Sequence, residues 1–417
     1  MTPATRRAEP VPDGVIAAAE ARRKLVRLLT VAAGVSYIAA TAVGVAMRLQ
    51  YLGLSVPIPF DHLLHAHSHT LYFGWAGLAI LSGAIAVAGR RLQSMNAAAA
   101  ALLASPPALL IGFAALGYHP ITIAISTVVM LVWYTVIVAW WISVRALRTT
   151  GHTALRAAMG YLVVASGGVW VLAGLQATGR GGALAESLAV HAFVGGFGWF
   201  MVLGVVGLLA TNADQLNIHF EDATLRSVIR WWVPLAWLTF PLSVAGGPET
   251  PILGPVSRLA GLALLVPAWL WVRTLWNASP GRAATLWRMA AAWFALFSLT
   301  LASVAVVGSQ ALTAGGRQAV VIHLHALLVG FVTGSLAVIG LHNRPNAAIW
   351  YHHVALAVML AGLLGVQLGA VQPGLWVAAG GAVVLWCTGV VWVTSALWMA
   401  APVSQDTFDA RNHRARA

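Results

Sequence analysis

Twelve apolar runs, each long enough to cross a lipid bilayer, follow one another along this chain. A transmembrane helix needs roughly 18 or more consecutive apolar residues. Charged residues and Pro or Gly separate the runs, and the resulting spans are 25–48, 62–88, 95–117, 120–144, 157–177, 186–211, 228–247, 252–276, 286–308, 319–341, 351–370 and 374–400. Only 8% of the 417 residues are charged, whereas a soluble domain carries about 25%. The sequence therefore predicts an all-α integral membrane protein with twelve transmembrane helices.

The loops between these spans are too short to hold a further domain. We expect a cytoplasmic N-terminal tail over 1–24, a single transmembrane domain over 25–400 and a cytoplasmic C-terminal tail over 401–417. The first segment has no small-residue cleavage site, so we interpret it as a retained tail and not as a signal peptide. Pro106 and Pro107 predict a kink or break in the third span.

Lysine and arginine predict the orientation in the membrane. Four of the 24 lie on one side, at Arg48, Arg180, Arg258 and Arg317, which leaves 20 (24 − 4) on the side of both termini. Because cytoplasmic loops carry the excess of basic residues, both termini are expected in the cytoplasm, and the membrane is expected to be a bacterial-type plasma membrane. The net charge of +13 is then explained by anionic lipids of the inner leaflet, and no nucleic-acid partner is predicted.

One pattern occurs three times: a histidine, a glycine seven residues later, and then an aromatic residue. The copies begin at His67, His191 and His323, which are 124 (191 − 67) and 132 (323 − 191) residues apart. Each copy starts five or six residues into a span that crosses from the outside to the inside, roughly 8 Å below the outer boundary at 1.5 Å per residue. Such spacing predicts a unit of four helices that is used three times.

Ionisable residues inside a bilayer are costly and mark functional sites. The candidate ligands of a haem or metal are His67, His69, His191, His323 and His325. Residues i and i+2 lie about 200° apart around a helix, so the two histidines of one HxH pair point to different neighbours. His62 and His65 are interpreted as polar lining of an entrance, and His352 and His353 are assigned no role.

Imidazole is the usual protein ligand of haem iron, and copper and zinc compete for it. The HExxH, CxxC and CxxCH motifs are absent. The two propionates of a haem need cationic partners, and Arg48, Arg258 and Arg317 lie near the level of the histidines. The glycine of each repeat is expected either to let a haem lie close to the backbone or to serve helix packing.

Twelve spans in three four-helix pseudo-repeats, with histidines on the second, sixth and tenth, resemble subunit I of the haem–copper oxidases and nitric-oxide reductases. The resemblance implies that His323 binds a high-spin haem and His325 a low-spin haem. His69, or His67 in another register, would be the opposite ligand of the low-spin haem, and His191 would be a copper ligand. The stretches from His65 to Gly74 and from His325 to Gly330 are also similar to motifs of the NnrS proteins, a haem- and copper-containing membrane family linked to nitric-oxide stress.

Several features of that oxidase family are missing. The span 228–247 contains no His-His pair, no tyrosine closely follows His191, no lysine lies beyond Lys24, and no arginine pair separates the last two spans. We therefore expect a membrane protein with b-type haem, and with copper as a second candidate metal, that is not a proton-pumping terminal oxidase. It would handle nitric oxide, another diatomic gas or electrons, with an electron donor or oxidase-type subunits as partners.

Two other classes of function are consistent with the composition. A secondary transporter would show two six-helix halves and self-similarity near 200 residues, roughly half the chain. A cofactor-free assembly protein on an oxidase-like scaffold would keep the helices without binding haem. Whether the protein catalyses a reaction is left open by the sequence.

Overall fold

The computed structural model describes residues 13–88, 96–178, 183–239, 253–278, 284–307, 316–341 and 346–399. These ranges contain helices and no strand. In chain order the helices are α1 (Asp13–Tyr51), α2 (Phe60–His69), η1 (Thr70–Gly77), α3 (Leu78–Val87), α4 (Asn96–Leu116), α5 (Pro120–Val144), α6 (Thr150–Thr178), α7 (Ala183–Thr211), α8 (Asp222–Leu238), α9 (Leu253–Ala263), α10 (Leu265–Asn277), α11 (Ala284–Val307), α13 (Gly316–His325), η4 (Ala326–Thr333), α14 (Gly334–Gly340), α15 (Ala347–Gln367) and α16 (Val371–Met399).

The twelve predicted spans correspond to these helices, so the predicted fold class is confirmed. Spans 62–88 and 319–341 are the continuous helices α2–η1–α3 and α13–η4–α14, and span 252–276 is α9–α10. Eleven helices within the described ranges are long and apolar enough to cross a membrane. The twelfth, α8, has 17 described helical residues. The chain is therefore a multi-pass membrane protein.

Two details differ from the expectation. Helix α1 begins at Asp13 and includes residues that were expected in the tail before residue 25. Helix α4 runs through Pro106 and Pro107 without a break, because the helix N-terminal to a proline can continue once neighbouring groups satisfy the freed carbonyl. Residues 1–12 and 400–417 of the expected tails lie outside the described ranges.

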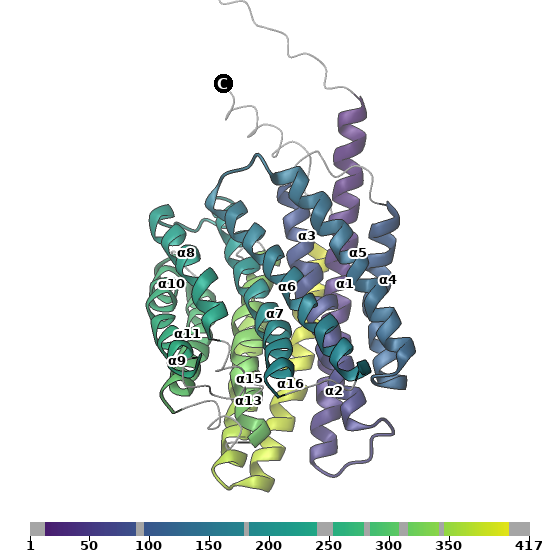
Figure 1. Ribbon diagram of the computed structural model, residues 1–417, viewed down its shortest axis with the longest axis vertical. Coiled ribbons are helices and arrows are strands. Elements are labelled where there is room, and N and C mark those ends of the chain that lie inside the picture. Colours follow the sequence, from purple (N-terminus) through teal and green to yellow (C-terminus); the bar gives the residue numbers. More distant parts are fainter. Residues whose placement is uncertain are drawn as a thin grey trace, which may run out of the picture.

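The three helices that carry the repeated pattern are the most enclosed. In the central windows of α2–η1–α3, α7 and α13–η4–α14, 72% of the residues are buried, against 33–50% in the other spans. The helices run side by side in one bundle (Figure 1), and many apolar side chains of the other helices are exposed where lipid would lie. Lipid is as apolar as leucine, so this outer surface needs no protein cover.

Taken in chain order, the membrane crossings form three groups of four. The first group is α1–α5, the second is α6–α10 and the third is α11–α16, with α6 against α7 and α15 against α16 as close pairs. Neighbouring groups meet through α5 and α6, through α10 and α11, and through α1 and α16, so the groups form a closed ring. The fourfold unit predicted from the histidine spacing is the unit of this architecture.

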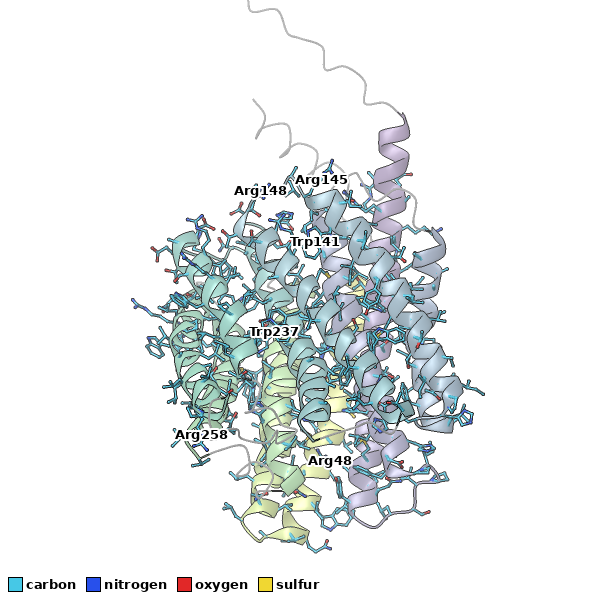
Figure 2. All side chains as sticks on the ribbon, viewed as in Figure 1. Arg48, Trp141, Arg145, Arg148, Trp237 and Arg258 are labelled. Atoms are coloured by element: carbon cyan, nitrogen blue, oxygen red, sulfur yellow. The ribbon has the colours of Figure 1, made fainter. Side chains whose placement is uncertain are left out.

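Basic side chains lie at both ends of the bundle. Figure 2 places Arg145 and Arg148 at the end where α1 begins, and Arg48 and Arg258 at the opposite end. This is the separation that the sequence predicts. Which end faces the cytoplasm stays a prediction.

Candidate haem or metal site

Each HxH pair ends a segment of α-helix, and a π-helical segment follows at once. Helix α2 ends at His69 and η1 begins at Thr70, while α13 ends at His325 and η4 begins at Ala326. Helix α7, which has a single histidine in the repeat, is assigned α throughout. π-Helical segments are rare in proteins, and those that occur are often found at functional sites. Their position therefore distinguishes the two HxH helices from α7.

His67 and His325 face each other across the bundle. Their ring centroids are 6.4 Å apart and their ring planes differ by 13°. A metal held at about 2 Å by one nitrogen of each imidazole places the two centroids roughly 6 Å apart. The separation of these two rings therefore suits one metal ion between them.

Hydrogen bonds to backbone carbonyls fix the tautomer of each ring. The Nδ1 of His67 lies 2.7 Å from the carbonyl oxygen of Ala40, and the Nδ1 of His325 lies 2.9 Å from that of Val321. A carbonyl only accepts, so each Nδ1 carries the proton and each Nε2 keeps its lone pair. Neither Nε2 has a hydrogen-bond partner in the described part of the chain. This is the tautomer that a metal-binding histidine needs.

The backbone of α1 passes close beside this pair. A methyl group on Gly44 would lie 3.0 Å from the Cε1 of His67, so glycine leaves room for the imidazole. Arg48, one turn further along α1, lies within electrostatic range of both His67 and His325. Its guanidinium also lies 5.8 Å from the ring centre of Tyr51. Among the arginines predicted as propionate partners, Arg48 is beside the facing pair.

The other two arginines lie elsewhere or are not described. The Nη1 of Arg258 donates a hydrogen bond of 3.1 Å to the carbonyl of Val306 on α11. Arg317 belongs to α13, but its side chain lies outside the described part of the structure. Arg258 and Arg317 as propionate partners therefore stay predictions.

His69 points away from His67, as the 200° rule predicts. Its Nδ1 lies 3.0 Å from the carbonyl of His65, and its ring stacks on Phe113 at 4.1 Å with Phe193 at 6.1 Å. These contacts place His69 between α4 and α7. Of the two alternatives for the ligand opposite His325, the described geometry favours His67.

His323 faces α11. Its Nδ1 lies 2.7 Å from the Oγ1 of Thr300, and its ring centroid lies 4.7 Å from that of Phe297. Phe297 also lines an apolar cavity of about 10 Å³ between α7, α8, α9, α10 and α11, which has room for roughly one water molecule. His323 and His325 thus serve two different compartments.

Copper has less support. The side chain of His191, the expected copper ligand on α7, lies outside the described part of the structure. Among the residues that are described, no group of three His, Cys, Asp or Glu side chains is arranged to hold a metal ion. A site of two imidazoles, such as His67 and His325, suits a haem, because the porphyrin supplies the other four ligands of the iron.

The repeated glycines serve helix packing. A methyl group on Gly74 would lie 2.8 Å from Ser36 and 2.9 Å from Pro106, and one on Gly330 would lie 2.4 Å from the Cγ of Trp293. At Gly198 the nearest atom would be 3.6 Å away. Of the two roles predicted for these glycines, close packing is therefore the one that the contacts support.

Two buried histidines were given no role by sequence reasoning. His352 and His353 on α15 each expose 1% of their surface. The Oη of Tyr37 lies 3.3 Å from the Nδ1 of His352, and the indole of Trp293 donates a hydrogen bond of 3.1 Å to the Nδ1 of His353. They were not singled out because they lie near a predicted helix end. The signal that could have identified them is two adjacent ionisable residues in an apolar run.

Comparison with known proteins identifies the fold. No family model matches the chain, and no curated protein matches it either. Among solved structures, a haem–copper terminal oxidase dimer determined by cryo-electron microscopy is similar, with a TM-score of 0.68 over 92% of this chain and 84% of the oxidase chain. The aligned sequences are 11% identical, so this similarity concerns the fold alone. The chain is a multi-pass membrane protein with the fold of a haem–copper oxidase.

Proposed function

We propose that this protein binds one b-type haem between His67 and His325 and uses it to transfer electrons. The observation that carries the proposal is the pair of imidazoles 6.4 Å apart, each with its Nδ1 hydrogen-bonded to a backbone carbonyl, which leaves its Nε2 with a free lone pair. The haem would be b-type because the CxxCH motif of covalently attached haem is absent.

In this proposal each part of the site has a task. His67 and His325 would hold the iron of the haem, while the carbonyls of Ala40 and Val321 fix their tautomers. Arg48 is the propionate partner, and Gly44 leaves space beside the His67 ring. When bound, a haem with two histidine ligands supplies one-electron transfer. A second protein, either an electron donor or an oxidase-type subunit, is then required.

A second candidate function is the handling of nitric oxide or another diatomic gas. This function is favoured by the apolar cavity of about 10 Å³ that Phe297 lines. The ring of His323 packs against Phe297. A gas molecule of two atoms is close to water in size, so the cavity suits it. In this function His323 would bind a second haem and His191 would bind copper. The resemblance to the NnrS proteins supports the same function.

The two alternative classes make different predictions. A secondary transporter was expected to have two six-helix halves, but the bundle has three groups of four crossings around three enclosed helices. A cofactor-free assembly protein would have the same fold without haem. The localisation that fits the proposal is a bacterial-type plasma membrane, with both termini in the cytoplasm.

The proposal is tested by the haem and metal content of the purified protein. We expect one haem per chain, released intact by acidic acetone, and an optical spectrum of six-coordinate low-spin iron in both oxidation states. Carbon monoxide should leave the reduced spectrum of that haem unchanged, because both axial positions are filled. A protein purified without haem after expression in haem-supplemented cells would support the assembly-protein alternative.

Arg48 should raise the reduction potential of this haem. The Arg48→Gln variant removes a positive charge that lies in electrostatic range of both ligands. A nearby cation favours the reduced iron, so its loss should lower the midpoint potential by roughly tens of millivolts. Spectroelectrochemical titration measures the shift, with Arg145→Gln at the opposite end of the bundle as the control. Equal potentials in the wild type and the Arg48→Gln protein would contradict the assignment.

A further inference from the structure

We propose that Thr333 and His352 are positioning residues that lock the two π-helical segments and so set the rotation of His67 and His325. This inference rests on the proposed haem site. It concerns side chains that do not contact either imidazole. They lie in the core formed by η1, η4, α1 and α15, further along the ligand helices than the HxH pairs.

A π segment changes the direction in which a helix presents its side chains. One extra residue in a turn rotates everything beyond it by about 100°, because successive residues of an α-helix are 100° apart. Both η1 and η4 begin at the residue after an HxH pair. The direction in which the histidines face, relative to the rest of each helix, therefore depends on the π segment. Whatever holds the π segments also fixes the histidines.

The first part of the lock joins the two π segments directly. The indole Nε1 of Trp75 in η1 donates a hydrogen bond of 2.9 Å to the Oγ1 of Thr333 in η4. The same hydroxyl donates its proton at 2.9 Å to the carbonyl of Leu328, five residues earlier in η4. Thr333 exposes 2% of its surface and Trp75 exposes 6%. One buried hydroxyl thus connects η1 to the hydrogen bonding of η4.

The second part of the lock joins η4 to α1 through α15. The Nε2 of His352 lies 3.3 Å from the carbonyl of Val329 in η4, and its Nδ1 lies 3.3 Å from the Oη of Tyr37 on α1. The carbonyl only accepts, so Nε2 carries the proton, and Nδ1 accepts from the tyrosine hydroxyl. Neutral His352 thereby uses both of its nitrogens. Val329 lies one helical turn beyond the ligand His325.

The two parts of the lock meet at Tyr37. Its ring centroid lies 5.1 Å from that of Trp75 and 5.3 Å from that of Trp392. Tyr37 also precedes Ala40, the residue whose carbonyl holds the Nδ1 of His67, by one turn of α1. The network therefore connects the backbone that orients His67 with the segment that follows His325. Removing either part should let the two ligand helices rotate relative to each other.

The decisive variant is Thr333→Val, which keeps the shape of the side chain but removes the hydroxyl. It leaves both the Trp75 indole and the Leu328 carbonyl without this partner in a buried site. Such a loss should weaken the low-spin, bis-histidine state roughly tenfold. We expect a high-spin ferric signal in electron paramagnetic resonance and carbon monoxide binding by the reduced protein. Thr394→Val is the matched control, because Thr394 is exposed on α16 and bonds only within its own helix.

His352 allows a test by rescue. His352→Leu removes both hydrogen bonds, whereas His352→Gln keeps one donor for Val329 and one acceptor for Tyr37. We expect high-spin haem in the His352→Leu protein and a return to low-spin haem in the His352→Gln protein. A general loss of packing would not produce this rescue. If Thr333→Val does not fold, Trp75→Phe removes the indole donor and keeps an aromatic ring in its place.

The outcomes separate this inference from the function on which it rests. A wild-type protein without haem overturns both. A wild-type protein with low-spin haem, together with Thr333→Val and His352→Leu proteins of unchanged spin state, overturns the lock and leaves the haem site standing. A low-spin wild type with high-spin variants supports both proposals.

Discussion

Replacement of His67 or His325 by alanine is expected to abolish the low-spin haem. Changes to groups that only support a ligand cost about 10–100-fold in metal affinity, so loss of the ligand itself should cost more than roughly 100-fold. We expect the purified His67→Ala and His325→Ala proteins to lose most of their haem, or to keep a weakly bound high-spin haem. Haem-to-protein ratios and the Soret band measure this loss.

His69→Ala is the matched control, since His69 lies on the same helix and two residues away. Its ring is held among Phe113 and Phe193 and faces a different compartment. The variant should keep the haem and its low-spin spectrum. If His69→Ala loses the haem while His67→Ala keeps it, the pairing of His67 with His325 is wrong and the other register of the oxidase-like pair is correct.

Gly330→Ala is expected to destabilise the folded protein. The added methyl group would lie 2.4 Å from the Cγ and 2.7 Å from the Cβ of Trp293, and both atoms are too close to the backbone of α11 to move freely. Overpacking of this kind costs about 1–3 kcal/mol. Since Trp293 also donates its indole proton to His353, a displaced ring would weaken that hydrogen bond. The expected result is a lower thermal unfolding temperature in detergent.

The control for this substitution is Gly160→Ala in α6. A methyl group on Gly160 meets no atom within 4 Å, and alanine favours helix more than glycine does. Gly160→Ala should therefore leave the unfolding temperature unchanged or raise it. Equal unfolding temperatures for Gly330→Ala and wild type would mean that α11 and η4 can separate without cost, which would contradict the packing role of the repeated glycine.

The proline pair of α4 shows the limits of reading the sequence. The twelve spans followed from hydrophobicity, because the bilayer demands a helix of a certain length wherever charge is absent. The continuity of α4 through Pro106 did not follow, although Ser105 of the same helix donates a hydrogen bond of 2.8 Å to the carbonyl of Leu102, which Pro106 leaves without its helical donor. Pro106 itself packs beside Gly74 of η1.

The choice between His67 and His69 also needed the three-dimensional structure. Alignment of the repeats equates His67 with His323 and His69 with His325, and the resemblance to the oxidases implied His69 as the partner of His325, or His67 in another register. In a ring of similar units, each contact joins the leading side of one unit to the trailing side of the next. The second histidine of α13 therefore meets the first histidine of α2, and not its own equivalent.

By itself the sequence determined that this chain crosses a membrane about twelve times, that its unit is four helices long, and that the repeated histidines belong to three of these helices. Those properties depend on composition and periodicity, which are local. Only the tertiary structure decided that His67 is the residue opposite His325, that Gly74 and Gly330 pack against other helices, and that His352 is hydrogen-bonded below the site. Those properties depend on helix rotation, which is set by contacts between residues more than 300 positions apart in the chain.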